Sequence, residues 1–585
     1  MAVLKNSIDT DVLVIGGGLA GTWAALRAKE FVSNVILVDK AQVSRSGCSS
    51  FAAGVMLCPM PEDNLKEWSE ELVERGEYLC DQEWVELLLH EQVERIKEMQ
   101  RWNFPFERDS EGELIRIVGR AHMRTRMLMF HGKKLMEEMR KQVLKKGVTL
   151  VERTMITELL TSDGKQPTQG HVVGAVGFNP RTEEFKTFRA KAVIIATGPA
   201  TGKIGAGYTD ANTGDGTAMA FRTGAELIGM EFCIRGEPTI WNKKCVAYGI
   251  NMIQGYGAKF LNAKGERFME KYAPVLKERA RKIEICTAMC KEVLEGRGPI
   301  YCDMRHLPPE TFARFRRVIP HTMQVFDSAG IDPSKQLIEY APRWGVYVVS
   351  GEGGIRINLD CETNIPGLYA AGTGGWNPTQ GTYSVGGNNL AFCCVSGFRA
   401  GERAAKYSLD REVDIQTEQV QALKANTLGP LSRKDGFVPD KIFEMIQRAV
   451  TPAQFGVFKS EPRMKQVQSE LEKAELAASK LVAANYHELV KSNEALNYVL
   501  LSQLAFRAAS ERKESRGFHF REEYPERDDI NWLKWIILKR DNKGVGLRLE
   551  PIPIDRYPFK PESFKKHPYA APFFFGNQKG EKDGY

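Results

Sequence analysis

The stretch DVLVIGGGLAGTWAALRAKEFVSNVILVD, residues 11–39, decides the fold class. It opens with a short apolar run (11–15), as expected for a strand buried in a parallel sheet. A glycine-rich turn follows at once, and residues 22–29 then read as a helix. A second apolar strand (35–38) ends in Asp39. The stretch therefore predicts a strand–turn–helix–strand unit with an acid at its far end.

Each glycine of this turn has its own task. Gly16 permits the tight turn, Gly18 lets the backbone approach a pyrophosphate, and Gly21 lets the helix pack closely on the strand. The N-terminus of the helix faces the phosphate charge, and Asp39 can accept hydrogen bonds from a ribose hydroxyl. Because strand, turn, helix and acid occur in register, the stretch predicts a dinucleotide-binding domain.

Later segments repeat the combination of an apolar strand and glycines. The segment ATG (196–198) ends one strand, and NTGDG (212–216) opens a helix. Much further along, GLYAAGTGG (367–375) repeats the pattern and GGNNL (386–390) opens an apolar helix. One nucleotide domain is thus interrupted and resumed, and its late part can bring backbone N–H groups to a flavin. This arrangement favours FAD over NAD.

Length and composition narrow the class of protein. The 585 residues predict roughly three or four domains, which rules out a small disulfide scaffold. Hydrophobic residues make up 43%, too many for a disordered chain, and no apolar run is long enough for a transmembrane helix. The net charge of +7 is spread along the chain, so no nucleic-acid partner is expected. The start shows no apolar signal segment, which predicts a cytoplasmic protein whose 11 cysteines are thiols without metal or cluster spacing.

Several motifs outside the nucleotide unit carry a resemblance. They are NAKGERFMEKYAP (262–274), YCDMRHL (301–307), IPGLYAAG (365–372) and ESRGFHFREEYPERDDINWLK (514–534). Together with the glycine motifs, the chain resembles the fumarate reductase, succinate dehydrogenase and aspartate oxidase flavoprotein superfamily over residues 8–540. The last motif has little to do with nucleotide binding, so it separates this superfamily from other flavoproteins.

The resemblance implies the architecture. It implies an α/β FAD-binding, Rossmann-like domain that is interrupted by an α+β capping domain and followed by a helical domain. The boundaries are predicted at 1–235 plus 346–410 for the FAD domain, 236–345 for the cap and 411–540 for the helical domain. Residues 541–585 form a tail rich in proline and aromatic residues. Its Phe573, Phe574 and Phe575 need an apolar surface, either on this chain or on another subunit.

The flavin linkage is the first departure from the family. Membrane-bound relatives carry a histidine after Arg-Ser that is joined covalently to flavin, whereas here Gly47 follows Arg45 and Ser46. FAD should therefore be non-covalent, and the R-S-G motif is similar to that of the adenylylsulfate reductase α subunit. The residues predicted to hold FAD are Gly16, Gly18, Leu19, Ala20, Gly21, Asp39, Lys40, Arg45, Ser46, Gly47, Ala53, Gly54, Ala196, Thr197, Gly198, Asp215, Gly372, Thr373, Asn388, Asn389 and Leu390.

The residues that bind the dicarboxylate in the family are replaced together. Glu237 stands at the histidine of H-P-T-G, and the family's proton-donating arginine falls on Gln254. The clamping histidine falls within residues 342–347, and a further arginine falls on Ser384. Glutamine is never charged and cannot serve as that acid. We therefore expect no appreciable fumarate or succinate activity, and a substrate that is less charged and more aromatic than fumarate.

Other side chains of the cap and the flavin side are candidates for the chemistry. Arginines clamp anions, Glu, His or Tyr can transfer a proton, and Trp can stack on an unsaturated substrate. The candidate catalytic residues are Arg235, Glu237, Tyr256, Arg343, Trp344 and His131. Five further residues are expected near this site: Arg120 and His122 upstream of His131, Tyr347 near the end of the cap, and Tyr383 and Ser384 on the flavin side.

Three functions remain open at this level. The first is the large flavoprotein subunit of a reductase or dehydrogenase that exchanges electrons between a small organic substrate and an iron–sulfur, ferredoxin-like partner subunit. The resemblance implies this partner, since the chain has no cluster motif of its own. The second is a flavin oxidase resembling aspartate oxidase. The third is an electron-relay flavoprotein subunit without its own substrate.

Overall fold

The computed structural model describes residues 7–52, 54–203, 212–241, 246–247, 250–346, 352–383 and 385–568. A seven-stranded sheet forms the centre of the FAD-binding part, in the order β6-β2-β1-β9-β8-β7 with β17 also paired to β9. Its strands are β1 (Ser7–Ile15), β2 (Val35–Val38), β6 (Thr149–Val151), β7 (Met155–Thr161), β8 (Val172–Phe178), β9 (Phe185–Ile195) and β17 (Leu368–Ala370). Strand β1 pairs in parallel with β2 and β9, and β2–β6 and β9–β17 are also parallel pairs. Strand β8 pairs antiparallel with both β7 and β9.

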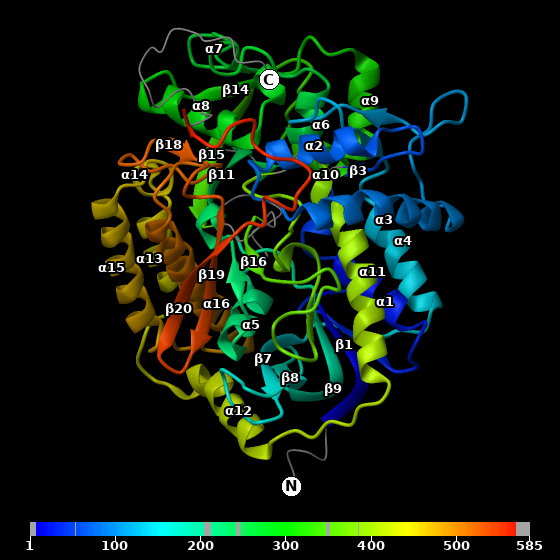
Figure 1. Ribbon diagram of the computed structural model, residues 1–585, viewed down its shortest axis with the longest axis vertical. Helices are drawn as coiled ribbons and strands as arrows, with labels where there is room; N and C mark the ends of the chain where they lie inside the picture. The colour runs from blue at the N-terminus through cyan, green and yellow to red at the C-terminus, as the bar shows by residue number, and fades with distance from the viewer. Residues whose placement is uncertain are drawn as a thin grey trace.

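The predicted interruption of the nucleotide domain is confirmed. The register of β17 aligns Leu368 with Val193 and Ala370 with Ile195, so the late glycine-rich segment returns to the strand that ends in the ATG segment. The mixed α/β class with an inserted cap and a C-terminal helical part is likewise confirmed (Figure 1).

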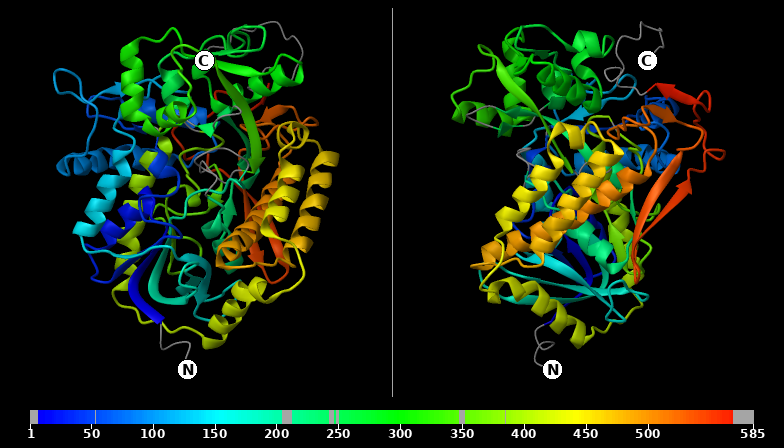
Figure 2. Two further views of the ribbon diagram at one scale, coloured as in Figure 1. Left: turned by 180° about the vertical axis from the view of Figure 1, so that it is seen from behind. Right: turned by 90° about the vertical axis from the view of Figure 1, so that its left-hand side faces the viewer.

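Two helices cover one face of the sheet and lie unusually close to each other. They are α1 (Leu19–Ala28) and α11 (Asn388–Ser408). A Cβ at Gly397 would lie 2.4 Å from the Ala20 carbonyl oxygen, and one at Gly401 would lie 2.3 Å from that of Ala24. Only glycine fits at such a distance, so the two helices meet backbone to backbone (Figure 2).

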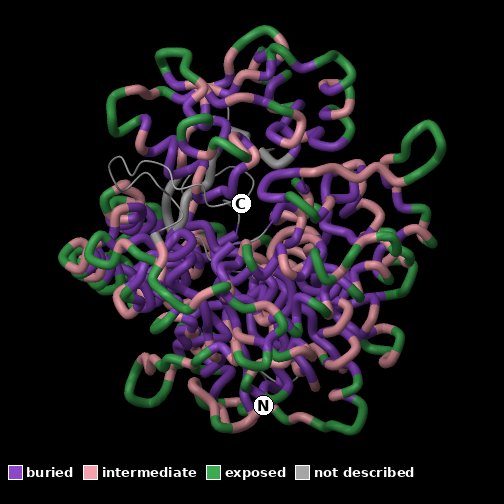
Figure 3. Tube along the Cα trace, turned by 45° about the horizontal axis from the view of Figure 1, so that its top comes forward, coloured by how far each residue is buried: buried purple, intermediate pink, exposed green. Residues whose placement is uncertain are grey.

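The cap lies at one end of the molecule, at the top of Figure 1. A sheet ordered β12-β11-β15-β14-β13 carries it, and Figure 3 shows that its outer loops are exposed. Its elements are β11 (Ile234–Trp241), β12 (Val246–Ala247), α6 (Ile250–Gly255), β13 (Lys259–Leu261), α7 (Met269–Tyr272), η4 (Lys277–Arg279), α8 (Lys282–Leu294), β14 (Ile300–Asp303), α9 (Pro309–Val318), α10 (Pro320–Ser328) and β15 (Ile338–Val346). The Val318 carbonyl oxygen would touch a Cβ at either Gly54 or Gly132, so the cap packs closely on the FAD-binding part.

The C-terminal part packs helices on the opposite side from α1 and α11 (Figures 1 and 2). These helices are α12 (Thr417–Ser432), α13 (Pro439–Val450), α14 (Ala453–Gly456), α15 (Glu461–Ala478) and α16 (Tyr486–Glu511). A hairpin of β19 (Lys534–Asp541) and β20 (Gly544–Pro551) then pairs with β10 (Leu227–Ile228) of the FAD-binding part.

This hairpin runs across residue 540, where the sequence places the end of the helical domain, and it extends into the predicted tail. The domain boundaries therefore stay a prediction. Phe573, Phe574 and Phe575 lie outside the described residues.

The remaining elements complete the fold. They are η1 (Cys48–Phe51), β3 (Val55–Leu57), α2 (Leu65–Arg75), α3 (Gln82–Arg101), β4 (Arg116–Ile117), β5 (Met127–Met129), α4 (Lys134–Lys145), α5 (Asp215–Thr223), η3 (Met230–Cys233), β16 (Gly354–Ile355), η5 (Gly372–Gly374), β18 (Glu526–Asp528) and β21 (Lys566–Pro568). In the described part of the chain, no helix is both long and apolar enough to cross a membrane.

Candidate active site

A cavity opens at the carboxyl ends of β1, β2 and β9, where open α/β sheets bind their ligands. Its empty space is about 910 Å³, including the mouth that faces solvent. Fourteen of the residues predicted to hold FAD line it: Gly16, Gly18, Leu19, Ala20, Asp39, Lys40, Ser46, Gly47, Ala196, Thr197, Gly198, Asp215, Gly372 and Thr373. Segments far apart in the sequence thus converge on one site.

The glycine turn has the geometry that the sequence predicts. Gly16 has a φ of +111°, and a Cβ there would lie 2.4 Å from the Ala196 carbonyl oxygen. A Cβ at Gly21 would lie 1.8 Å from the Gly16 carbonyl oxygen, so this glycine allows the helix to approach the turn. At Gly18 the nearest neighbour would be Ser49 Oγ at 3.6 Å, which leaves the backbone open toward the cavity.

The carboxylate of Asp39 is held by backbone donors at the cavity wall. Its Oδ2 accepts a hydrogen bond from the Gly17 N–H at 2.8 Å, and its Oδ1 accepts one from the Ala41 N–H at 2.7 Å. The Ser46 hydroxyl lies 3.3 Å from Oδ1. Since a carboxylate offers about four lone-pair sites, capacity remains for a ribose hydroxyl.

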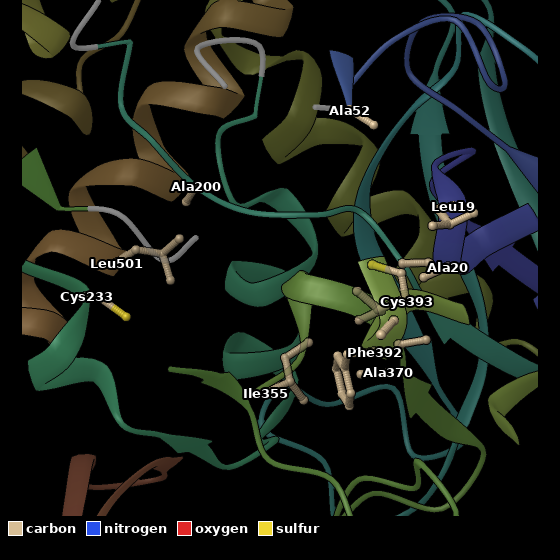
Figure 4. Packing of buried hydrophobic residues seen from close by; sticks show 14 of the residues in the cluster. Leu19, Ala20, Ala52, Ala200, Cys233, Ile355, Ala370, Phe392, Cys393 and Leu501 are labelled. Carbon is tan, nitrogen blue, oxygen red and sulfur yellow. The ribbon is translucent and has the colours of Figure 1, made fainter. Parts of the chain in front are cut away.

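A hydroxyl without a partner lies in the same cavity. Thr197 Oγ1 is buried and has no hydrogen-bond partner, although Thr197 lines the cavity. Cys393 of α11 lines it beside Ala20 of α1, and burial raises the pKa of the Cys393 thiol to about 12, so this thiol stays protonated (Figure 4). An open helix N-terminus, an oriented acid and an unused hydroxyl fit a dinucleotide such as FAD. Gly47 offers no side chain for a covalent bond to flavin.

Six described residues predicted to hold FAD do not line the cavity. Gly21 packs against the turn, Arg45 is exposed, and Gly54 lies against the cap. Asn388 and Asn389 bond to Thr379 and Gln380, respectively, at the start of α11. Leu390 is half-buried beyond them, and Ala53 lies outside the described residues.

Sequence reasoning missed other residues that line the cavity. Among them are three residues around the start of β7, the first residue of the NTGDG segment and a thiol in α11: Thr154, Met155, Ile156, Asn212 and Cys393. The position of Asn212 as the first residue of the NTGDG segment could have shown its role. Thr154–Ile156 carry no local signal, because sheet pairing alone brings them to the site.

Four candidate catalytic residues lie on the two long strands of the cap. The register of β11 and β15 aligns Arg235 with Gly345, Gly236 with Trp344, and Glu237 with Arg343. Because successive positions of a strand alternate between faces, positions 235, 237 and 343 share one face of this pair and position 344 belongs to the other. Tyr347 and Ser384 lie outside the described residues.

The other two candidates lie where the cap meets the FAD-binding part. The Tyr256 hydroxyl accepts a hydrogen bond from Arg314 Nη1 at 2.8 Å and lies 3.6 Å from Met129 Sδ. His131 follows Met129 by two residues, and its Nδ1 is buried without a hydrogen-bond partner. Tyr256 is therefore engaged in an interface contact, whereas His131 keeps an unused ring nitrogen.

Gln254 lies on α6 with both amide atoms unused. The residue is 1% exposed, and neither Nε2 nor Oε1 has a hydrogen-bond partner. The end of α6 packs on the segment before Arg120, since a Cβ at Gly255 would lie 3.4 Å from the Val118 carbonyl oxygen.

The segment that carries Arg120 contacts the residues just before α11. The Arg120 guanidinium carbon lies 5.1 Å from the ring centroid of Tyr383, whose buried hydroxyl has no hydrogen-bond partner. His122 Nε2 lies 2.9 Å from the Gly386 carbonyl oxygen, and its Nδ1 lies 2.7 Å from Thr125 Oγ1. Burial lowers the pKa of His122 to about 3, so this histidine is neutral and fixes the loop to α11.

Comparison with known proteins agrees with this geometry. The family described as FAD binding domain matches residues 11–390, and the family described as fumarate reductase flavoprotein C-term matches residues 446–565. The chain is 30% identical to one subunit of the fumarate reductase (CoM/CoB) of Methanothermobacter marburgensis, over 91% of this chain and 97% of that protein. It is 26% identical to the mitochondrial succinate dehydrogenase flavoprotein subunit of Oryza sativa, over 95% of this chain and 92% of that protein.

A solved structure shares the fold. The adenylylsulfate reductase of Archaeoglobus fulgidus superposes with a TM-score of 0.76 at 22% identity, covering 94% of this chain and 97% of that one. At this identity the likeness concerns the fold alone.

Proposed function

The chain belongs to the fumarate reductase and succinate dehydrogenase family of FAD-dependent oxidoreductases, and we propose that it is the large subunit of a reductase or dehydrogenase with a substrate other than fumarate. In this proposal it exchanges electrons between a small organic substrate and an iron–sulfur partner subunit. FAD, held non-covalently by the cavity residues, supplies the hydride and electron chemistry when bound.

The unpaired, buried amide of Gln254 is the observation that supports a substrate other than fumarate. A buried amide with neither donor nor acceptor used costs about 1–3 kcal/mol for each unpaired group. The fold bears this cost where the family resemblance expects a cationic proton donor. An amide offers both donors and acceptors but no charge, so it can pair fully with an uncharged carbonyl or amide group, whereas it supplies no positive charge to compensate a carboxylate.

The Tyr383 hydroxyl and His131 are the groups of this chain that we assign to proton handling. Both carry a buried polar atom without a hydrogen-bond partner. The Tyr383 hydroxyl can donate a hydrogen bond to a substrate oxygen, and the adjacent Arg120 guanidinium stabilises negative charge that develops there. His131 can hold or release a proton at its unused Nδ1.

Trp344 belongs to the other face of the strand pair, so only Arg235, Glu237 and Arg343 are assigned to substrate binding. Their alignment on β11 and β15 supports a common location for positions 235, 237 and 343 on one face. Tyr256 is assigned a positioning role, because its hydroxyl already bonds to Arg314.

The partner is proposed from the way electrons must leave the chain. No disulfide joins the ten described cysteines to one another, and no group of three or more potential metal ligands occurs among the described residues. The relative from Methanothermobacter marburgensis is itself named as a subunit. A separate protein that carries iron–sulfur clusters would accept or supply the electrons.

Anaerobic purification from the native source, without a tag on this chain, tests the proposal. A flavin spectrum with a broad iron–sulfur shoulder and a second polypeptide is expected. A single flavin-containing chain that consumes oxygen would instead identify a flavin oxidase. A complex whose flavin no organic compound reduces or reoxidises would identify an electron-relay subunit.

A further inference from the structure

The C-terminal helix α16 reaches the wall of the FAD cavity. Two of its residues, Glu494 and Asn497, bond to the side chains of Lys40 and Asp215, which line that cavity. Glu494 and Asn497 are three residues apart and so lie on one face of the helix. The cavity wall is therefore built partly by a segment that lies nearly 300 residues after Asp215.

Glu494 divides its two oxygens between two lysines. Its Oε1 accepts a hydrogen bond from Lys40 Nζ at 2.8 Å, and its Oε2 accepts one from Lys203 Nζ at 2.6 Å. The side chain of Glu494 is 8% exposed. Only Lys40 of the two lysines lines the cavity.

Two further residues, Asp215 and Thr213, also accept hydrogen bonds from the Lys40 ammonium. Lys40 Nζ also donates to Asp215 Oδ2 at 2.9 Å and to Thr213 Oγ1 at 3.1 Å. Asn497 Nδ2 donates to Asp215 Oδ1 at 3.0 Å. Burial opposes the charge on Lys40, but the Asp215 and Glu494 carboxylates outweigh it and raise the pKa of Lys40. The ammonium therefore stays charged and has three acceptors around it.

We propose that Glu494 is a positioning residue of the cofactor site, which holds the Lys40 ammonium at the cavity wall for FAD. Lysine has a long, flexible side chain, so one carboxylate alone leaves it several orientations, whereas acceptors on two elements restrict it to one. By linkage, FAD that binds to this prearranged wall also stabilises the docking of α16.

Affinity for FAD, measured on apoprotein by quenching of flavin fluorescence, tests the proposal without any substrate. We expect Glu494→Gln and Lys40→Met each to raise the dissociation constant of FAD about tenfold or more. The double variant should lose no more than Lys40→Met alone, because the two residues act as one unit. Glu511→Gln, on the same helix, and Lys203→Met, on the same carboxylate, should stay within about twofold of the unmodified protein.

Two further readouts separate positioning from a general loss of structure. The apoprotein of Glu494→Gln should have the same melting temperature as the apoprotein of Glu511→Gln. The rise in melting temperature that FAD causes should be smaller for Glu494→Gln. In the unmodified protein, FAD should slow hydrogen exchange across residues 486–511, and this result decides the matter if a variant does not fold.

Three results would overturn the proposal. The first is an FAD affinity of Glu494→Gln within twofold of the control. The second is a double variant whose loss equals the product of the two single losses. The third is hydrogen exchange in α16 that FAD leaves unchanged.

Discussion

The amide of Gln254 has hydrogen-bonding capacity that the fold leaves unused. Replacing a buried polar group without partners by an apolar one of similar shape removes a desolvation cost. We therefore expect Gln254→Leu to keep or raise the free energy of unfolding, by up to about 1–3 kcal/mol. Urea denaturation of the FAD-loaded protein measures this.

Gln468→Leu is the matched control for this variant. The Gln468 amide donates to the Phe506 carbonyl oxygen and to Ser510 Oγ, so its removal should cost about 1 kcal/mol. If Gln254→Leu lost as much stability as Gln468→Leu, the Gln254 amide would be bonded within the protein and its assignment to substrate would fail.

Lys459 provides a test by pH. It is fully buried, its Nζ donates to the Phe518 carbonyl oxygen at 3.2 Å, and burial together with the nearby Arg521 lowers its pKa to about 7. Between this value and the ordinary lysine pKa of 10.5, the unfolded chain holds a proton that the folded one lacks. The free energy of unfolding should therefore rise with pH across this window.

Lys459→Met should remove that rise, whereas exposed Lys465→Met should keep it. Denaturation at several pH values between 7 and 10.5 measures the slope. An unchanged slope in Lys459→Met would show that Lys459 stays charged in the folded protein.

At the scale of elements, the contact of α1 with α11 depends on glycine. Alanine is favoured over glycine inside a helix by about 1 kcal/mol, but a Cβ at Gly401 would lie 2.3 Å from the Ala24 carbonyl oxygen. We expect Gly401→Ala to lower the free energy of unfolding by about 1–3 kcal/mol, because overpacking separates the helices. Chemical denaturation measures the change.

Gly429→Ala in α12 is the control for that substitution. Apart from its chain neighbours, the nearest atom to a Cβ there would be Arg433 Nη2 at 3.6 Å, and the gain in helix propensity is opposed by the ring of Pro430, so the free energy of unfolding should change by less than about 1 kcal/mol. If Gly401→Ala were as stable as Gly429→Ala, the close approach of α1 and α11 would not exist.

Local pattern predicts the elements that carry their own signal. The glycine turn, its flanking strands and the return of β17 follow from residues 11–39 and 367–375, because glycine and apolar runs act locally. The hairpin β19–β20 does not follow, because its pairing with β10 depends on residues more than 300 positions away.

The same reason limits prediction of the site. Asp39 and Thr197 belong to readable motifs, whereas Thr154–Ile156 and Glu494 reach the cavity only through sheet pairing and helix docking. Which positions of β11 share a face with position 343 also depends on strand register, which the sequence pattern does not fix.

At the scale of the whole molecule, buried ion pairs join the C-terminal part to the FAD-binding part. Arg512 Nη2 lies 2.8 Å from Glu231 Oε1, and Arg512 Nη1 lies 2.7 Å from Glu514 Oε1, with all three side chains fully buried. Arg516 continues the network from Glu514 to Asp529. Burial raises the pKa of Glu231 although Arg512 opposes it, so this carboxylate depends on its partner.

Arg512→Met should therefore lower the free energy of unfolding by about 3–5 kcal/mol, because it leaves Glu231 buried without a cation. Thermal and urea denaturation measure the loss. The double variant Arg512→Met with Glu231→Met should recover part of it, since an apolar pair no longer needs compensation. A double variant less stable than Arg512→Met would contradict this account of the network.

We propose that this chain keeps the FAD site of its family but takes an uncharged substrate in place of a dicarboxylate. Anaerobic mixing of the photoreduced, FAD-loaded protein with fumarate, and separately with a panel of uncharged α,β-unsaturated amides and ketones, tests it most directly. We predict that fumarate leaves the flavin reduced while at least one uncharged compound reoxidises it. Reoxidation by fumarate faster than by every uncharged compound would contradict the claim.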